Sequence, residues 1–410
     1  MGKKLLVAQS GGPTSAINAT LAGVIEAAIR NPEVSDVLGA RYGIQGVLRE
    51  QFLDLSGIEH IEDMLATLAV TPAAALGSCR FKLKDPAQDP SEFEELIRIF
   101  QKHEIGYFVY IGGNDSMDTV WKLSDYIKEH HIPDIVVVGA PKTIDNDLYG
   151  IDHCPGFGSA AKYIATSISE LERELEVYDT PYVIVVEMMG RNAGWLTAAA
   201  ALAESANSNV PYLIYLEERP FDLNDFISDL RGELAVGKDV IVAISEGIRD
   251  RSGKMICDYA DRDQSTDAFG HTIATGAGKV LENAIRSNIG CKVRYIELNL
   301  LQRCAGHLLS ETDITESTEL GRNAVRLAVD GQNGVMSTLT RTSNHPYSVA
   351  YGAADIADIA DREKKVPDSW ITSEGNGVTE EMLEYLRPLV QGERSCKFEN
   401  GIPKYIVFNK

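Results

Sequence analysis

The chain has 410 residues, of which 44% are hydrophobic and 24% charged, and its formal net charge is −21. This length and composition predict a soluble globular protein that is large enough for two domains. The strongly negative charge disfavours nucleic acids and anionic membranes as partners. No run of about 18 apolar residues occurs, which argues against a membrane-spanning helix, and we expect a cytoplasmic protein.

Strand-like and helix-like segments alternate along the first part of the chain. In order, the sequence predicts a strand over 5–8, a helix over about 15–30, a helix over about 90–103, a strand over 107–111, a helix over about 116–131 and a strand over 135–138. This β-α-β order is typical of an open, mainly parallel sheet with helices on both faces.

A second set of the same kind follows a long predicted helix over about 158–178. Its predicted strands cover 182–186, 212–216, 240–245 and 292–298, and its predicted helices cover about 193–204, 223–234 and 276–287. A polar stretch over about 249–267 interrupts the pattern, and the chain beyond about 346 is charged and rich in turns. The sequence therefore predicts an α/β fold with two similar halves, of which the first ends near Pro155.

Two glycine-rich turns follow predicted strands and precede predicted helices. The first is Ser10-Gly11-Gly12, and the second is the sequence Gly-Gly-Asn-Asp-Ser over 112–116. Glycines in such turns let backbone N–H groups approach an anion, and the dipole of the following helix favours its negative charge. Glycine also serves the geometry of a tight turn, and Asn114 or Ser116 could simply cap a helix. Two such turns on neighbouring strands favour phosphate binding.

The loop Pro141-Lys-Thr-Ile-Asp-Asn-Asp147 brings together a lysine and two carboxylates. Proline disfavours helix at the preceding residue, so the strand ends there and the loop leaves the sheet. Of Asp145 and Asp147, one can hold Mg²⁺ while the other accepts a proton from a hydroxyl group. The alternative is an Asx turn with solvated carboxylates, which the neighbouring Lys142 and the loop at Gly113 make less favourable.

Several further charged residues follow glycine turns or strand ends. Arginine suits planar, bidentate recognition of phosphate, and four arginines in this acidic chain have such positions: Arg80, Arg191, Arg294 and Arg303. Each alone could form a surface ion pair, but together they favour a phosphorylated substrate. Glu246 lies at the end of a predicted strand, where it would suit hydrogen bonds to sugar hydroxyl groups.

These motifs, in this order over residues 10–303, resemble those of the phosphofructokinase family. The markers are the Gly11-Gly12 turn, the GGxxS loop at 112–116, the TIDND loop at 143–147, the MGR turn at 189–191, the Ser-Glu-Gly strand end at 245–247 and the pair Arg294 and Arg303. The resemblance implies two Rossmann-like α/β domains with mainly parallel sheets and an active site between them. Residues 1–156 and about 302–352 would bind the phosphoryl donor and Mg²⁺, and about 157–301 and 353–410 would bind the sugar phosphate.

The resemblance also implies roles for individual residues at the reacting end of the site. Asp145 matches the general base for the 1-hydroxyl group of fructose 6-phosphate, and Thr143 lies against the transferred phosphoryl group. Asp147 matches the carboxylate on the magnesium side, and Arg80 the arginine that bridges the phosphates. The donor phosphates would contact Gly11, Gly12, Gly113, Asp115 and Ser116.

For the sugar phosphate, the resemblance implies a second group of residues. Met189, Gly190 and Arg191 match the sugar-binding turn, and Glu246 matches the acceptor of sugar hydroxyl groups. Arg294 and Arg303 match the pair that grips the 6-phosphate, one of them reaching across from a neighbouring subunit. We therefore expect a homodimer or a higher homo-oligomer.

Two positions indicate the pyrophosphate-dependent branch of the family. Asp115 and Lys142 stand where ATP-using members have glycine, and Pro13 replaces an aspartate of their first turn. A carboxylate at 115 would crowd and repel the α-phosphate of ATP, and Lys142 would add charge for the short, highly anionic pyrophosphate. The expected reaction is the reversible phosphorylation of fructose 6-phosphate by pyrophosphate in glycolysis, giving fructose 1,6-bisphosphate and phosphate.

Three residues depart from the family pattern. Asn114 replaces an aspartate on the metal side, Leu300 replaces a histidine near the 6-phosphate, and Tyr182 replaces an intersubunit arginine. We still expect Asn114 with Asp147 at the metal, and Tyr182 at the sugar phosphate. The alternatives are an ATP-dependent 6-phosphofructokinase and a catalytically silent, ligand-sensing subunit. A dinucleotide-binding dehydrogenase is disfavoured because no GxGxxG opens the first helix.

Overall fold

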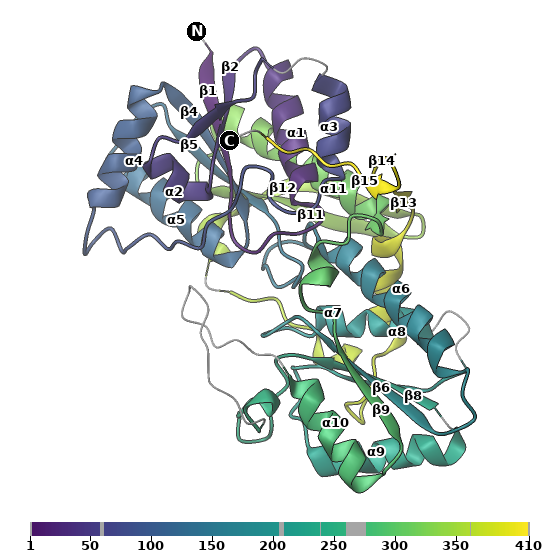
Figure 1. Cartoon of the computed structure of the whole chain (residues 1–410). Coiled ribbons are helices and arrows are strands. Elements are labelled where there is room, and N and C mark those ends of the chain that lie inside the picture. The colour runs from purple at the N-terminus through teal and green to yellow at the C-terminus, as the bar shows by residue number, and fades with distance from the viewer. Residues whose placement is uncertain are drawn as a thin grey trace.

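Two α/β domains lie end to end in the computed structural model, with the N-terminal one uppermost in Figure 1. The structure describes residues 2–57, 61–204, 209–237, 239–259, 276–360 and 362–408. The last part of the polar stretch predicted over 249–267 lies outside these ranges. No helix within them is both long and apolar enough to span a bilayer.

The first domain is built on a seven-stranded sheet. Its strands, in spatial order, are β12 (Tyr347–Asp355), β11 (Val335–Asn344), β5 (Val136–Pro141), β4 (Ile105–Gly112), β1 (Lys3–Gln9), β2 (Val34–Ala40) and β3 (Phe52–Asp54). The five central strands are parallel, whereas β12 and β3 pair antiparallel at the two edges. The predicted mainly parallel sheet is therefore confirmed.

Helices cover both faces of this sheet because neighbouring residues of its buried strands point to opposite sides. Leu5 and Val7 pack with α1 (Ile17–Arg30), α3 (Ile61–Ala69) and α11 (Glu311–Val329). Leu6 and Ala8 pack with the opposite layer, which contains α2 (Gly43–Leu48), α4 (Ser91–Lys102) and α5 (Asn114–Glu129). All five residues of the 107–111 strand segment are buried, as its apolar sequence predicts.

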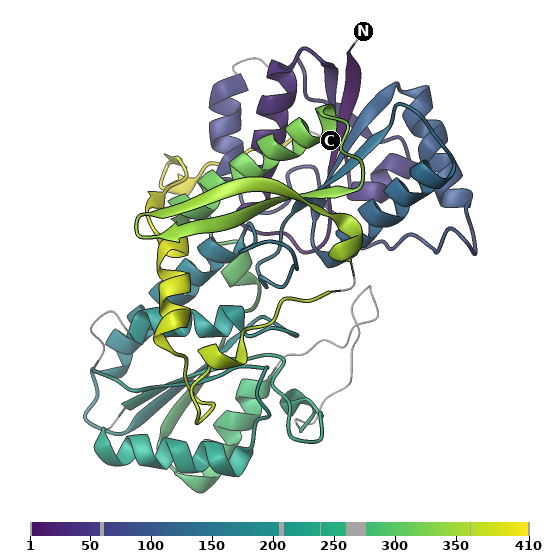
Figure 2. The ribbon, with the colours of Figure 1, turned by 180° about the vertical axis from the view of Figure 1, so that it is seen from behind.

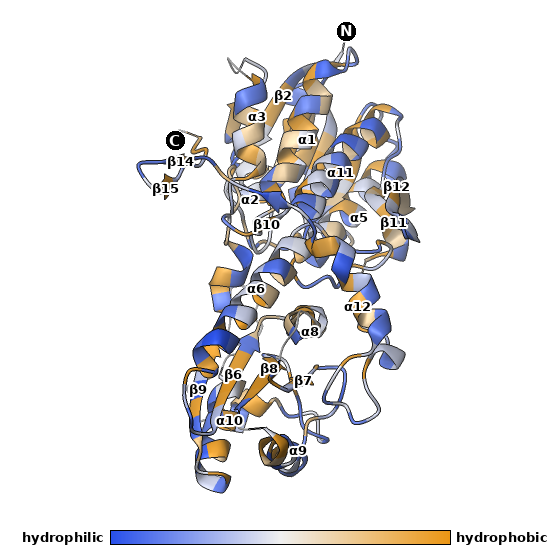
Figure 3. Cartoon of the chain, turned by 90° about the vertical axis from the view of Figure 1, so that its right-hand side faces the viewer, coloured by the Kyte–Doolittle hydropathy of each residue, from blue (hydrophilic) through white to orange (hydrophobic). Residues whose placement is uncertain are grey.

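The second domain repeats this arrangement on a smaller scale. Its four parallel strands, in spatial order, are β7 (Tyr212–Tyr215), β8 (Asp239–Ser245), β6 (Tyr182–Met188) and β9 (Lys292–Glu297). One face packs against α6 (Phe157–Leu175), α7 (Trp195–Ala198), α8 (Ala200–Glu204) and α12 (Glu380–Leu386), and the other against α9 (Leu223–Val236) and α10 (Ala277–Asn288). Figure 3 shows the apolar strands β6 and β8 between these layers.

The elements between residues 299 and 403 complete both domains. Besides α11, β11, β12 and α12, they are η2 (Asn299–Arg303), β10 (Leu309–Ser310), η3 (Ile356–Asp358), η4 (Asp368–Trp370), η5 (Arg387–Val390), β13 (Glu393–Arg394), β14 (Phe398–Glu399) and β15 (Ile402–Pro403), and η1 (Ile256–Tyr259) precedes them in the chain. The sequence prediction missed α11 and the long β11–β12 hairpin, which crosses the first domain in Figure 2.

The chain end lies beside the first domain. The backbone N–H of Ile406 donates to the Thr71 hydroxyl oxygen at 3.1 Å, and Arg41 donates to the Phe408 carbonyl oxygen at 3.0 Å. The predicted domain division, which gave all of 353–410 to the second domain, stays a prediction, but these contacts join the last residues to the first domain. Apolar packing accompanies these hydrogen bonds, because Ile406 and Phe408 pack against the hydrophobic cluster that contains α1 and α3.

Candidate active site

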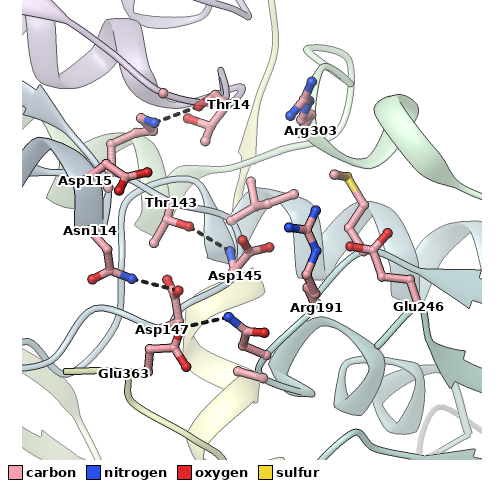
Figure 4. Close-up of a pocket in the computed structure, with 18 of the residues that line it drawn as sticks. Thr14, Asn114, Asp115, Thr143, Asp145, Asp147, Arg191, Glu246, Arg303 and Glu363 are labelled. Atoms are coloured by element: carbon pink, nitrogen blue, oxygen red, sulfur yellow. Dashed lines mark hydrogen bonds between the residues drawn. The ribbon is translucent and has the colours of Figure 1, made fainter. Parts of the chain in front are cut away.

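A cavity of about 670 Å³ lies between the two domains, at the carboxyl ends of their parallel strands. In α/β proteins, ligands bind at these ends because the loops there are free to vary. The cavity brings together most of the predicted site residues, namely Gly11, Gly12, Arg80, Gly113, Asn114, Asp115, Ser116, Lys142, Thr143, Asp145, Asp147, Met189, Arg191, Glu246 and Arg303. Figure 4 shows how the charged side chains among them converge.

The two glycine turns form one wall of the cavity. The hydroxyl groups of Ser10 and Ser116 are hydrogen-bonded to each other, which joins the turn after β1 to the first turn of α5. The Ser78 hydroxyl donates to the Gly11 carbonyl oxygen at 2.6 Å and fixes the first turn from its other side. Because α5 begins at Asn114, after Gly113, its amino-terminal end lies at this wall and favours a bound anion.

Lys142 connects the ends of three strands at the base of this wall. Its backbone N–H donates to the Gly112 carbonyl oxygen at 2.9 Å, and its ammonium group donates to the Gly12 carbonyl oxygen at 2.6 Å. The side chain is only 2% exposed. This burial lowers the pKa of Lys142 to about 8, against the opposing influence of the Asp145 carboxylate.

The loop after β5 presents two carboxylates to the cavity, with a buried residue between them. The Asp145 backbone N–H donates to the Thr143 hydroxyl oxygen at 3.1 Å, and Asn146 has a left-handed φ of 56°. Burial raises the pKa of Asp145, although the positive charges of Lys142 and Arg191 oppose the shift. Burial and the charge of Asp145 raise the pKa of Asp147 to about 7. The two carboxylates therefore repel each other in a partly desolvated site.

Asp147 and Asn114 fit a divalent cation that also contacts substrate phosphates. The Asn114 side-chain amide donates to an Asp147 carboxylate oxygen at 2.9 Å, so the two groups lie together. No cluster of three or more His, Cys, Asp or Glu side chains suited to a metal occurs in the described ranges. Mg²⁺ commonly needs only one or two protein carboxylates beside waters and phosphates, and a cation here would relieve the repulsion around Asp147.

The turn after β6 forms the wall of the second domain. Gly190 has a φ of 121°, and a Cβ atom at this position would lie 2.6 Å from the Ala193 carbonyl oxygen, so the turn requires glycine. The Ser245 hydroxyl donates to the Gly190 carbonyl oxygen at 2.5 Å, and the Gly190 backbone N–H donates to Glu246 at 3.4 Å. Burial, followed by the charge of Asp145, raises the pKa of Glu246 to about 8.

Arginines supply much of the positive charge of the cavity. Arg191 comes from the turn after β6, and its buried Nε atom has no hydrogen-bond partner among the described residues. Arg303 reaches the first domain, since a Cβ atom on Gly12 would lie 3.0 Å from its Nη1 atom. Arg80 lines the same cavity. Such a group of guanidinium ions is suited to phosphorylated ligands.

Two predicted residues lie away from this cavity. Tyr182 is only 4% exposed and begins β6, whereas the cavity lies at the other end of that strand. The ammonium group of Lys292 lies 3.9 Å from the centre of the Tyr182 ring. Tyr182 therefore does not line the cavity of its own chain, and its expected contact with a sugar phosphate stays a prediction.

Arg294 also does not line the cavity, because it lies on the exposed edge strand β9. Leu300, which departs from the expected family pattern, is 53% exposed and is absent from the cavity lining. Of the turn over 189–191, Met189 and Arg191 line the cavity, whereas Gly190 does not.

The structure adds residues that the sequence did not indicate. Glu363 lines the cavity beside Asp147, and Arg249, Lys254 and Asp258 line it from the loops after β8. Glu363 accepts a 2.7 Å hydrogen bond from the Asn192 side-chain amide. No local pattern marks Glu363, which lies in the charged region beyond residue 346.

Comparison with known proteins agrees with this architecture. The family model described as Phosphofructokinase matches residues 4–328. The pyrophosphate--fructose 6-phosphate 1-phosphotransferase of Xanthomonas campestris pv. campestris is 43% identical over 407 residues, which cover 98% of this chain and 95% of that protein. That of Halomonas elongata is 41% identical over 402 residues, covering 97% and 94%.

A solved structure extends the likeness to the whole fold. The crystal structure of a pyrophosphate-dependent phosphofructokinase from Nitrosospira multiformis has a TM-score of 0.87 and 37% sequence identity, and the match covers 98% of this chain and 96% of that one. The match thus extends beyond the shared loops to both domains. This chain belongs to the phosphofructokinase family.

Proposed function

We propose that this protein transfers a phosphoryl group from pyrophosphate to the 1-hydroxyl group of fructose 6-phosphate, reversibly, as part of glycolysis. The observation that carries the proposal is the 2.6 Å hydrogen bond from the Lys142 ammonium group to the Gly12 carbonyl oxygen. It lies in the wall of the cavity that the loops with Gly12, Gly113 and Asp115 form, here called the donor wall. A cation at this place adds charge for two linked phosphates, and the carboxylate of Asp115 repels a longer polyphosphate chain. The names of the relatives from Xanthomonas and Halomonas support the same donor and acceptor.

The proposed reaction asks the protein mainly to position its substrates and to stabilise negative charge. Asp145 would accept the proton of the 1-hydroxyl group while the oxygen of this hydroxyl group attacks the nearer phosphorus of pyrophosphate. The bond between the attacked phosphorus and the bridging oxygen breaks, and this oxygen leaves with the electron pair as part of the departing phosphate. Lys142 and Arg80 would stabilise the charge that moves onto this phosphate, with Thr143 and the Gly113 loop beside the transferred group.

The second domain would hold the sugar in the same reaction. Glu246 would accept hydrogen bonds from sugar hydroxyl groups. Met189 and Arg191 would hold the sugar ring against the loop that carries Asp145 and Asp147, here called the reacting loop. Arg303 would bind the 6-phosphate. Arg294 faces outward from β9, and we propose that it reaches the 6-phosphate site of a second subunit. The active protein would then be at least a homodimer. We place its activity in the cytoplasm.

We propose Mg²⁺ as the metal of this site, held by Asp147 and Asn114. When bound, Mg²⁺ would neutralise phosphate charge and help to orient the donor. The neutral oxygen of Asn114 supplies less charge than a second carboxylate would, so the site depends more on Asp147 and on the phosphates themselves.

Product analysis tests the proposed function. Fructose 6-phosphate, pyrophosphate and Mg²⁺ are incubated with the purified protein, and phosphorus NMR follows the products. We expect one fructose 1,6-bisphosphate and one free phosphate for each pyrophosphate consumed. Binding of the sugar phosphate without turnover would instead identify a ligand-sensing protein, and turnover only with ATP would identify an ATP-dependent 6-phosphofructokinase.

A further inference from the structure

A short segment of the chain, residues 363–366, connects the two walls of the cavity. It follows β12 and η3 and runs from the first domain toward the second, as the yellow-green trace in Figure 2 shows. Glu363 forms an antiparallel bridge with Leu148, just after the loop that carries Asp145 and Asp147. The Lys364 backbone N–H donates to the Asp147 carbonyl oxygen at 2.7 Å. The segment thus binds the backbone of the reacting loop.

The Lys364 side chain binds this loop a second time. Its ammonium group donates to the Asp152 carbonyl oxygen at 2.6 Å, to the Asn146 side-chain oxygen at 3.2 Å and to the Ile151 carbonyl oxygen at 3.3 Å. All three acceptors belong to the chain that follows β5. The single ammonium group of Lys364 therefore binds three separate oxygen atoms of this loop, and none of these oxygens carries a formal negative charge.

Asn146 is the residue on which these contacts converge. It is fully buried, and its left-handed backbone separates Asp145 from Asp147. Its side-chain oxygen also accepts from the Cys154 backbone N–H at 2.9 Å, and its amide donates to the Tyr385 hydroxyl oxygen at 2.8 Å. A shift of Asn146 would turn the backbone on both sides, so the directions of the two carboxylates depend on its place.

The same segment also binds the wall of the second domain. The indole N–H of Trp195 donates to the Lys364 carbonyl oxygen at 2.9 Å, and the Asn192 amide donates to Glu363 at 2.7 Å. Asn192 directly follows Arg191 in the sugar-binding turn. Lys364 therefore contacts the reacting loop through its N–H and ammonium groups and the sugar side through its carbonyl group.

We propose that Lys364 is a positioning residue for phosphoryl transfer. It holds Asn146 in place, so that the Asp145 carboxylate faces the hydroxyl group of the sugar held by the sugar-binding turn. This inference rests on the proposed function. Lys364 does not line the cavity and touches no reacting atom, so it acts through Asp145. Misplacement of a reacting group by about 1 Å can lower a rate roughly 100-fold, whereas the binding surfaces for both substrates stay in place.

The test is a double-mutant cycle on kcat between Lys364 and Asp145. Lys364→Met keeps most of the length of the side chain and removes its three hydrogen bonds. We expect kcat to fall roughly 10- to 100-fold, with KM for fructose 6-phosphate and pyrophosphate changed less than about threefold. In an Asp145→Ser background the same substitution should lower the residual kcat less than about threefold, because no base is left to be positioned.

A matched control comes from the neighbouring residue. Lys365 is exposed and pairs with Glu217 at 3.2 Å, outside the cavity lining, so Lys365→Met should retain the wild-type kcat. If Lys364→Met fails to fold, as judged by a lost cooperative melting transition, Lys364→Arg enters the same cycle with the same expected coupling, since a planar guanidinium cannot satisfy the same three oxygens.

The outcomes separate the two hypotheses. An equal fall of kcat in the wild-type and Asp145→Ser backgrounds, or no fall in either, would overturn the role of Lys364 while wild-type turnover upholds the proposed function. Absence of turnover by the wild-type protein with pyrophosphate would count against the proposed function instead.

Discussion

The ammonium group of Lys142 lies 2.6 Å from the carbonyl oxygen of Gly12 and thereby joins the loop after β5 to the loop after β1. The two loops form the donor wall of the cavity together with Gly113 and Asp115. A lysine that is almost fully buried at this place combines two effects: it supplies a positive charge and it fills space. The predictions about the donor follow from this pair.

Removal of the Lys142 side chain should weaken the use of pyrophosphate. We expect Lys142→Ala to lower kcat/KM for pyrophosphate roughly 10²–10³-fold, because a buried cation next to the donor is lost. Steady-state rates at saturating fructose 6-phosphate measure this. Lys122→Ala is the control, since Lys122 pairs with Asp118 on α5 and does not line the cavity. Equal kinetics for the Lys142 and Lys122 variants would exclude Lys142 from donor binding.

The lowered pKa of Lys142 predicts a pH dependence. Burial holds this pKa at about 8, and a lysine is charged only below its pKa. In the free protein the positive charge is therefore lost as the pH rises through about 8, and kcat/KM for pyrophosphate should fall in that range. Lys142→Arg stays charged and should lack this fall. A wild-type profile that stays level to about pH 10, the pKa of an ordinary lysine, would contradict the prediction.

Loss of the proposed base should affect turnover more than binding. We expect Asp145→Ser to lower kcat roughly 10²–10⁴-fold while KM for fructose 6-phosphate changes little, because the proton acceptor acts in the transition state. Comparison of both constants in one set of rate measurements checks this. Wild-type turnover in the variant would remove Asp145 from the mechanism.

The turn at Gly190 offers a test of the sugar side. Its φ of 121° and the nearby Ala193 carbonyl oxygen leave no room for a Cβ atom, so Gly190→Ala should displace Met189 and Arg191. We expect KM for fructose 6-phosphate to rise roughly tenfold, with a much smaller effect on pyrophosphate. Gly232→Ala on α9, where a Cβ atom would meet nothing within 4 Å, should leave both constants unchanged. Parallel rises for both substrates would point to general unfolding.

Much of the site could be predicted because its loops are local. A buried strand followed by glycine, as at Gly112 and Gly113, defines both a strand end and a backbone that can approach an anion. The polar residues of 141–147 follow such a strand directly, so their place at the sheet edge follows from the chain itself. The α/β fold was predictable for the same reason, since alternating apolar segments indicate strands and helices one after another.

The failures have a common cause in distant contacts. The place of Tyr182 at the amino end of β6, away from the cavity of its own chain, could be recognised only in the fold. The hairpin of β11 and β12 was missed because most of its strand residues are exposed or only partly buried, and its sequence therefore lacks a long apolar run. Lys364 binds the reacting loop largely through carbonyl groups, which leave no signal in a sequence.

Removal of both donor-side residues tests how far they decide the donor. We expect the double variant Asp115→Gly with Lys142→Gly to lose most of its activity with pyrophosphate and to gain measurable turnover with ATP, because repulsion of the α-phosphate is relieved and space is opened. Rates with each donor at fixed fructose 6-phosphate measure this. If activity with ATP stays absent, other parts of the donor wall must also exclude the nucleotide.

The most direct measurement is kcat/KM of the wild-type protein for pyrophosphate and for ATP, under one concentration of fructose 6-phosphate and Mg²⁺. A donor wall filled by Lys142 and Asp115 predicts a preference for pyrophosphate of at least roughly 10²-fold. Equal values for the two donors, or a preference for ATP, would contradict it.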